Sequence, residues 1–193
     1  MGTTVGVLGL QGDYSLHIRM LQRLRVPNRI VRWPEELVEC GGLILPGGES
    51  TTFMKLLQET GLGEALQSYA KSHAVMGTCA GLITLSTSVS GDSKVKPLGI
   101  IDVKVERNAF GRQIDSFVEA IRIPDFAPKE NFEGVFIRAP RIVEIGAGVK
   151  SMGFRGDEIV MARSDKTLVL TFHPELTSDT RIHEYFVKKM VEG

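Results

Sequence analysis

The sequence predicts an α/β fold: a doubly wound, mostly parallel sheet flanked by helices, with an antiparallel or mixed extension in the second half. Up to about residue 88, short apolar segments alternate with stretches of helical periodicity, which is typical of a parallel sheet covered on both faces. From about residue 98 the apolar segments are short and their links are rich in Gly, Pro and charge, which indicates antiparallel strands. No linker or repeat divides the 193 residues, and the 42% hydrophobic content suffices for one core. We therefore expect a single domain over residues 1–193.

The first half is expected to alternate strand and helix. A helix over residues 14–24 carries Leu16, Met20 and Leu24 at helical spacing. The other expected elements are strands at 4–10, 29–33, 43–45 and 74–77, and helices at 52–59, 63–72 and 80–88. Ligands of parallel sheets gather at the carboxyl ends of the strands, so the residues that follow these strands are the first candidates for function.

The second half is expected to hold short strands and one last helix. The expected strands lie at 100–105, 117–121, 134–139, 142–145, 151–154 and 159–162, and a buried strand follows at 167–172. The helix is expected over 179–191, with Ile182, Phe186 and Met190 on one face. Thr177 or Ser178 is expected to cap it.

The composition excludes several classes of protein. Lys plus Arg and Asp plus Glu both number 23, so the charge does not point to a nucleic acid or an anionic membrane as partner. No stretch approaches the length of a membrane span, and no basic segment typical of a secretory signal opens the chain. Cys40 and Cys79 make no disulfide framework, and no paired Cys/His spacing indicates a metal site. We expect a cytoplasmic protein with no metal and no cofactor.

The most informative segment is Gly77-Thr78-Cys79-Ala80-Gly81. It follows the apolar residues 74–76 and precedes a helix-favouring stretch, so it predicts a strand, a sharp turn and a helix with a thiol at the apex. This is the cysteine form of the nucleophile elbow, in which small flanking residues let the turn pack closely. The first amides of the helix would favour the reactive thiolate. A buried cysteine in an ordinary strand-to-helix turn is the structural alternative, and this motif alone does not separate the two.

A second candidate follows the expected strand at 167–172. His173 is followed by Pro174 and Glu175, and the proline disfavours helical backbone angles at the histidine. In an extended chain, residues two apart face the same side, so His173 and Glu175 are expected to point into one site. A nucleophile, a base and a group that orients the base form the general arrangement of covalent catalysis. With Cys79, the sequence predicts a Cys-His-Glu triad.

A pair of glycines follows the expected strand at 43–45. In residues 46–50, Pro-Gly-Gly-Glu-Ser, the glycines allow backbone amides to turn toward a ligand. Fixed amides suit an oxyanion, because they are already in place when charge develops. A Pro-Gly turn that leads into a helix capped by Ser50 or Thr51 is an alternative that can hold at the same time.

Together the three motifs resemble those of class I, triad-type glutamine amidotransferases. More narrowly, the chain resembles the glutaminase subunits of pyridoxal 5′-phosphate synthase, and this resemblance runs from end to end. It includes residues 6–12 (GVLGLQG) and residues 105–113 (VERNAFGRQ), two segments that separate this branch from other glutaminase domains. Gly9 stands where the family more often has Ala, and no departure touches a catalytic position.

The resemblance implies a role for each site residue. The triad would be Cys79, His173 and Glu175, and the oxyanion hole the backbone amides of Gly48 and Ala80. The glutamine-binding positions would be Gly47, Gly48, Glu49, Arg107, Ile137 and Arg138. Arginine can grip a carboxylate with two hydrogen bonds, which suits the α-carboxylate of glutamine. The neighbouring Arg141 is an alternative to Arg138, and a surface ion pair is an alternative role for either Arg107 or Arg138.

The resemblance also implies an activity and a partner. The chain would hydrolyse L-glutamine to L-glutamate and ammonia. It would deliver the ammonia to a (β/α)8-barrel synthase in a hetero-oligomer, for the biosynthesis of pyridoxal 5′-phosphate (vitamin B6). Sugar phosphates would bind the partner, because this chain has no P-loop or dinucleotide motif. The loop at Gln11 is expected to be coupled to the partner.

Alternatives from other classes remain open at this point. The chain could be the glutaminase subunit of a different synthase. A cysteine peptidase or a stress protein of related fold can also carry an elbow cysteine. Those proteins would not need both the glycine turn at 47–48 and the His-Pro-Glu segment at 173–175.

Overall fold

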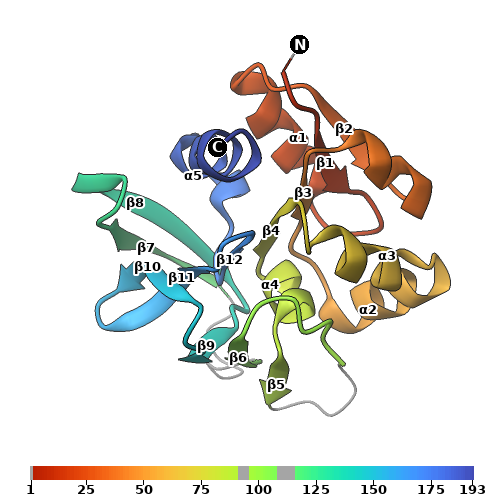
Figure 1. Cartoon of the computed structure of the whole chain (residues 1–193). Helices are drawn as coiled ribbons and strands as arrows, with labels where there is room; N and C mark the ends of the chain where they lie inside the picture. Colours follow the sequence, from red (N-terminus) through yellow and green to blue (C-terminus); the bar gives the residue numbers. More distant parts are fainter. Residues whose placement is uncertain (1, 91–95, 108–115) are drawn as a thin grey trace.

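The computed structural model describes residues 2–90, 96–107 and 116–193, so residues 108–113 of the segment singled out above lie outside it. Its main feature is a nine-stranded sheet in the order β2-β1-β3-β4-β12-β11-β10-β7-β8, with a small second sheet, β5-β6-β9. Neighbouring strands from β2 to β12 are parallel, and those from β12 to β8 are antiparallel. Figure 1 shows helices flanking the sheet. The predicted fold class is confirmed.

The parallel strands lie where the apolar segments predict them. They are β1 (Val5–Leu8), β2 (Asn28–Val31), β3 (Gly42–Leu45), β4 (Ala74–Thr78) and β12 (Thr167–Leu170). All of them except β2 are buried along their whole length, as continuous apolar strands between two layers of helices must be. Leu170 pairs with Thr78 at the ends of β12 and β4, so the segments after these two strands leave the sheet side by side.

Helices pack on both faces of the parallel strands. They are α1 (Tyr14–Arg23), α2 (Ser50–Glu59), α3 (Leu62–Tyr69), α4 (Ala80–Leu85) and α5 (Arg181–Phe186). Leu21 of α1 and Phe186 of α5 belong to one apolar cluster, together with Ile44 of β3. Its neighbour Leu45 belongs to the opposite cluster, with α2, α3 and α4. Side chains of successive strand residues thus pack into two different cores, one on each face of the sheet.

The antiparallel strands extend the sheet. They are β7 (Ser116–Ile123), β8 (Ala127–Ile137), β10 (Lys150–Arg155) and β11 (Glu158–Arg163). The sequence prediction for β8, residues 134–139, was wrong at both ends. The strand starts seven residues earlier because it pairs with β7 along a long hairpin, from Ser116 with Ile137 to Ile123 with Ala127.

The small sheet begins at the end of the segment that was predicted to be the helix after Cys79. It contains β5 (Ser88–Ser90), β6 (Val103–Glu106) and β9 (Arg141–Ile145). The helix predicted over 80–88 ends at Leu85, because Ser86 adopts extended angles (φ −63°, ψ 166°) and the chain then pairs with β6. A strand with polar residues on both sides of one valine gives no periodicity to predict it from.

Two predicted helix caps were wrong. Glu49 caps α2, and its carboxylate accepts hydrogen bonds from the backbone N–H groups of Thr51 and Thr52. The last helix begins only after Thr180, which makes no side-chain cap. Thr177 is already engaged in the preceding turn, where its hydroxyl donates to the Pro174 carbonyl.

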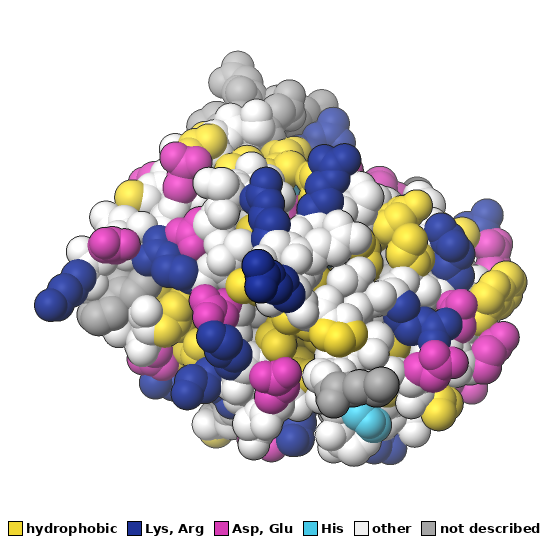
Figure 2. Space-filling model, turned by 90° about the horizontal axis from the view of Figure 1, so that it is seen from above, with side chains coloured by type: hydrophobic (Ala, Val, Ile, Leu, Met, Phe, Trp, Pro, Cys, Tyr) yellow, Lys and Arg dark blue, Asp and Glu magenta, His cyan; other side chains and the backbone are white. Residues whose placement is uncertain are grey.

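Short turns of other helix types complete the fold. A 3₁₀ turn, η1 (Pro34–Glu39), precedes β3, and a second one, η2 (Pro174–Leu176), follows β12. The last helix continues from α5 into a π turn, η3 (Val187–Val191). In the part of the chain that the structure describes, no helix is both long and apolar enough to cross a bilayer. Figure 2 shows basic and acidic side chains interspersed over one face, in keeping with their equal numbers.

Candidate active site

The candidate site lies where β3, β4 and β12 end at the same edge of the sheet. A cavity of about 360 Å³ opens there, within the usual range for small-molecule sites. Its lining includes seven of the residues predicted from the sequence: Gly48, Glu49, Cys79, Arg107, Ile137, Arg138 and His173. The topology therefore gathers residues from both halves of the chain around one hollow.

Cys79 forms the apex of a sharp turn between β4 and α4. Its backbone angles, φ +49° and ψ −102°, lie in a region that residues other than glycine rarely adopt. The flanking glycines allow close packing: a Cβ on Gly77 would lie 2.7 Å from the backbone carbon of Gly81, and one on Gly81 would lie 2.3 Å from the Leu45 carbonyl oxygen. The thiol donates to the carbonyl of Ile137 over 3.8 Å. These features match a nucleophile elbow.

His173 and Glu175 are in contact, but by a different route from the one predicted. Nδ1 of His173 lies 2.7 Å from Oε1 of Glu175. His173 is non-helical (φ −110°, ψ 88°), as the following proline requires. Pro174 then starts the 3₁₀ turn η2, which folds the Glu175 carboxylate back to the imidazole. The prediction of an extended chain at residues 173–175 was therefore wrong, although the predicted contact between His173 and Glu175 is present.

The surroundings set the charges of this pair. Burial disfavours the His173 imidazolium, yet interactions with the Cys79 sulfur and the Glu175 carboxylate outweigh burial and raise the pKa of His173 to about 10. Burial also opposes ionisation of Glu175, while His17 and His173 hold the pKa of this carboxyl well below its usual range. At neutral pH His173 is therefore an imidazolium with a carboxylate on one side and the Cys79 sulfur on the other.

The glycine turn after β3 packs tightly against its neighbours. A Cβ on Gly47 would lie 2.3 Å from Cε1 of His173. Gly48 has φ +144°, and a Cβ there would lie 2.5 Å from the side-chain amide of Gln11. Oε1 of Gln11 accepts a hydrogen bond from the Glu49 backbone N–H at 3.2 Å. The predicted partner-coupled residue thus lies directly on the predicted oxyanion turn.

The two amides predicted for an oxyanion hole come from different elements. Ala80 is the first residue of α4, and the first N–H groups of a helix have no partner within it. The carbonyl oxygen of Gly47 lies against Gly12, only 1.8 Å from where a Cβ would stand. Because the two ends of a trans peptide point in opposite directions, the Gly48 N–H points away from Gly12. Gly48 and Cys79 line the same cavity.

Charged side chains form part of the cavity lining. Nη2 of Arg107 lies 3.5 Å from Oε1 of Glu49. Burial opposes ionisation of Glu49, but hydrogen bonds from Thr52 and Thr51 outweigh it and lower the pKa of this carboxyl to about 2. Glu49 is therefore ionised and fixed as the cap of α2, beside an arginine that faces the cavity.

The structure distinguishes Arg138 from Arg141. Arg138 lines the cavity and has φ +43°, a strained value for a residue with a side chain. Arg141 lies on β9, and its Nη2 is 2.8 Å from Oε1 of Glu158. Strain in a residue at the cavity is typical of functional positions, so the geometry favours Arg138 over Arg141 at this site.

Two buried histidines that sequence reasoning missed lie behind Glu175. His17 of α1 and His183 of α5 are both fully buried, and Nε2 of His17 lies 3.4 Å from Oε2 of Glu175. The predicted apolar face of the first helix was Leu16, Met20 and Leu24, whereas the buried residues are His17, Met20 and Leu21. The sequence did contain a sign that His17 is buried. His17 lies one helical turn before Leu21, so the two side chains share one face of α1.

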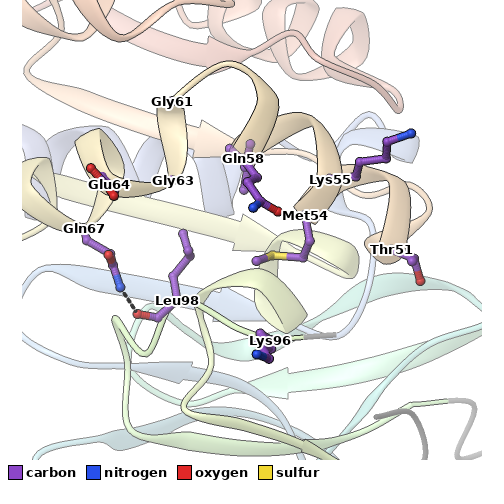
Figure 3. A pocket seen from close by; sticks show the side chains of 11 residues that line it. Thr51, Met54, Lys55, Gln58, Gly61, Gly63, Glu64, Gln67, Lys96 and Leu98 are labelled. Atoms are coloured by element: carbon purple, nitrogen blue, oxygen red, sulfur yellow. Dashed lines mark hydrogen bonds between the residues drawn. The ribbon is translucent and has the colours of Figure 1, made fainter. Parts of the chain in front are cut away.

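A larger hollow lies elsewhere, between α2, α3 and Leu98 (Figure 3). Its volume is about 640 Å³, and Gln67 donates a hydrogen bond of 2.7 Å to the Leu98 carbonyl at its edge. None of the residues predicted for the site is among those that line it. Chemistry, and not volume, therefore identifies the candidate active site.

Comparison with known proteins defines the class. A crystal structure described as a glutamine amidotransferase superposes with a TM-score of 0.91 at 42% sequence identity, over 98% of this chain and 99% of that one. PurLQS from Thermotoga maritima superposes with a TM-score of 0.70 at 14% identity, over 97% and 99% of the two chains, which shows a shared fold. The fold is that of the glutamine amidotransferases.

The chain belongs to the SNO glutamine amidotransferase family, whose sequence profile matches residues 7–192. The pyridoxal 5′-phosphate synthase subunit PdxT of Thermosipho africanus is 48% identical over 184 residues, or 95% of this chain and 96% of that one. The subunit of the same name from Pyrococcus furiosus is 48% identical over 196 aligned positions, or 97% and 98% of the two chains. The resemblance drawn from the sequence is confirmed.

Proposed function

We propose that this chain is the glutaminase subunit of a pyridoxal 5′-phosphate synthase, with Cys79 as nucleophile. The observation that carries the proposal is the position of Cys79 at a strained apex beside the ionised His173–Glu175 pair. Relatives named as synthase subunits match nearly the whole chain, which supports treating residues 1–193 as one catalytic domain. Family membership favours this function over that of a peptidase or a stress protein.

The proposed reaction begins at the sulfur. The Cys79 thiolate attacks the side-chain amide carbon of L-glutamine while His173 holds the proton. The tetrahedral oxyanion is stabilised by the backbone N–H groups of Gly48 and Ala80, and His173 gives its proton to the departing ammonia. Water, activated by His173, then hydrolyses the glutamyl thioester to L-glutamate. Glu175 orients the imidazole and stabilises its charge throughout.

Glutamine is proposed to bind in the 360 Å³ cavity. The guanidinium groups of Arg107 and Arg138 would hold its α-carboxylate, since an arginine fork matches a carboxylate with two hydrogen bonds. Glu49 lies 3.5 Å from Arg107 and keeps it turned toward the cavity. The turn at Gly47 and Gly48 and the backbone of Ile137 would bound the amide end next to the sulfur.

The partner in this proposal is a (β/α)8-barrel synthase that receives the ammonia. Ammonia released into water at neutral pH becomes ammonium, which is not a nucleophile, so transfer must be sheltered. The test is pyridoxal 5′-phosphate formation by the complex of this chain and the barrel synthase, with either L-glutamine or an ammonium salt as nitrogen source. The complex that carries Cys79→Ala is expected to use the ammonium salt and not glutamine.

The same test separates the alternatives. If glutamine is hydrolysed but supports no pyridoxal 5′-phosphate formation by the barrel synthase, the chain serves another synthase. Normal use of glutamine by the Cys79→Ala complex would refute the assignment of the nucleophile.

A further inference from the structure

A line of buried polar groups continues from the proposed triad away from the cavity. Glu175 presents Oε1 to His173 and Oε2 to the opposite side, where Nε2 of His17 lies 3.4 Å away. Nδ1 of His17 lies 2.9 Å from Nε2 of His183. All four side chains belong to residues that are at most 6% exposed. The hydroxyl of Thr78 lies 3.4 Å from Nε2 of His17 and is also buried.

The distances identify a hydrogen-bonded cluster and not a metal site. The two imidazoles of His17 and His183 bring their nitrogens to 2.9 Å, a normal hydrogen-bond length. A tetrahedral zinc ion, with nitrogen ligands at about 2.0–2.1 Å, would hold the two nitrogens farther apart. One of the two histidines must therefore donate a proton to the other.

One arrangement of protons fits the surroundings best. If Nε2–H of His183 donates to Nδ1 of His17, then His17 carries its own proton on Nε2 and presents it to Glu175. The nitrogen left over is Nδ1 of His183, which has no hydrogen-bond partner within the described residues. In this arrangement it is only an unused lone pair, whereas the reverse arrangement would bury an unpaired N–H. Burial and the neighbouring His17 lower the pKa of His183 to about 3, so His183 is neutral.

We propose that His17 is a positioning residue for the glutaminase reaction, with His183 setting its tautomer. Its Nε2–H holds Oε2 of Glu175, so that Oε1 stays on Nδ1 of His173. The inference rests on the proposed function, because it concerns the same triad. His17 is absent from the lining of the cavity and acts only through Glu175.

The contact between His17 and Glu175 is long in the isolated chain. At 3.4 Å it exceeds a normal hydrogen bond, and Oε2 of Glu175 has no hydrogen-bond partner within the described residues. Hydrogen bonds of this kind often shorten when substrate or partner binds. A buried carboxylate that no donor faces is driven to take up a proton. Loss of His17 should therefore weaken the charge that keeps His173 an imidazolium, and leave glutamine binding intact.

The first test compares variants of the complex with the barrel synthase in glutaminase assays. His17→Leu is expected to lower kcat about tenfold, with KM for glutamine unchanged within about twofold. The alkaline limb of the kcat profile should move to lower pH, because a less well-held Glu175 carboxylate retains the His173 proton less tightly. His17→Gln, whose amide N–H can replace Nε2–H, should restore most of kcat. Leu21→Val removes a buried methylene from the same helix and should change neither kcat nor the profile.

A double-mutant cycle separates positioning from a general effect on folding. In a Glu175→Gln background, His17→Leu is expected to cost less than about twofold in kcat, since the group through which it acts is gone. A tenfold loss in both backgrounds would overturn the proposal, as would equal losses in the Leu and Gln variants of His17.

A measurement on the unmutated chain needs no activity at all. Nitrogen NMR of the imidazoles at pH 7 should find protons on Nε2 of His17 and on Nε2 of His183, and no proton on Nδ1 of either. A proton on Nδ1 of His17 would overturn the proposal. If instead the complex releases no glutamate while these tautomers are found, the proposed function fails and the hydrogen-bond arrangement stands.

Discussion

Cys40 and Cys79 show at the residue scale how surroundings separate two chemically identical side chains. Cys40 is 3% exposed, its thiol donates over 3.5 Å to the carbonyl of Glu36, and burial raises its pKa. Cys79 lies in a cavity beside an imidazolium and at the start of a helix. The first environment disfavours the thiolate, whereas the second places the Cys79 sulfur beside a cation and a substrate-sized cavity. Both cysteines are buried by area, so exposure alone does not reveal which one is reactive.

The charge of His173 predicts a pH dependence of stability. Its pKa is raised to about 10 in the folded chain, against about 6.5 for a free histidine, so the folded state holds the proton more tightly. This contribution to the free energy of unfolding is fully present below about pH 6.5 and is lost as the pH rises through about 10. The stability advantage of the unmutated chain over His173→Asn should therefore shrink across that interval.

Urea unfolding of both proteins at a series of pH values measures this difference. Groups that do not interact with His173 titrate alike in the two proteins and cancel, so the difference reports on His173 with its partners Cys79 and Glu175. A difference that stays constant from pH 6.5 to pH 10 would mean that His173 holds no extra proton in the folded state.

At the scale of elements, the close packing of α4 against β3 allows a prediction about Gly81. A Cβ on Gly81 would meet the Leu45 carbonyl oxygen at 2.3 Å, and backbone atoms of β3 cannot give way cheaply. Gly81→Ala should therefore lower the free energy of unfolding by about 1–3 kcal/mol and reduce glutaminase activity, because α4 must shift away from Cys79. Gly148→Ala is the matched control, since a Cβ there would meet no atom within 4 Å.

Chemical denaturation and glutaminase assays on both variants provide the measurement. Equal stability of the two alanine variants would show that β3 and α4 are not packed as closely as this turn requires.

The elements also show which features could be predicted from the sequence. The strands β1, β3, β4 and β12 are short apolar segments, and a buried parallel strand needs little else to be recognised. Cys79, His173 and Gly48 follow such strands directly, so their convergence could be predicted from topology alone. The helix caps could not be predicted in this way. Glu49, and not Ser50, caps α2, because the turn before the helix brings the Glu49 carboxylate to the backbone N–H groups of Thr51 and Thr52.

Contacts between distant elements were the least predictable part of the site. His17 and His183 are 166 positions apart and meet only because α1 and α5 pack on one face of the sheet. The backbone strain at Arg138 arises in the bend that follows the long strand β8, whose start the sequence did not reveal. Local patterns report on neighbours in the chain, and these features depend on neighbours in space.

At the scale of the whole molecule, we predict that the chain alone is a poor glutaminase and gains activity when the synthase docks. Gln11 contacts the oxyanion turn and belongs to the loop that follows β1, so a docked synthase that pressed on this loop could act on the turn as well. The glycines at 47 and 48 allow a peptide flip that a bulkier residue would resist. Without one oxyanion donor the rate is expected to be about a hundred- to a thousandfold lower.

Steady-state glutamate release with and without the barrel synthase checks this gating. Gln11→Ala should reduce the gain on docking. Equal rates in the presence and absence of the synthase would exclude gating, while leaving the triad untouched.

The central claim is that Cys79 attacks glutamine, and labelling with a glutamine-mimicking alkylating agent tests it most directly. The agent should modify one cysteine per chain, and peptide mass spectrometry should place the label on Cys79. Loss of glutaminase activity should follow the extent of labelling, and excess glutamine should slow both. Stoichiometric label on Cys40, or full activity in a chain labelled at Cys79, would contradict the claim.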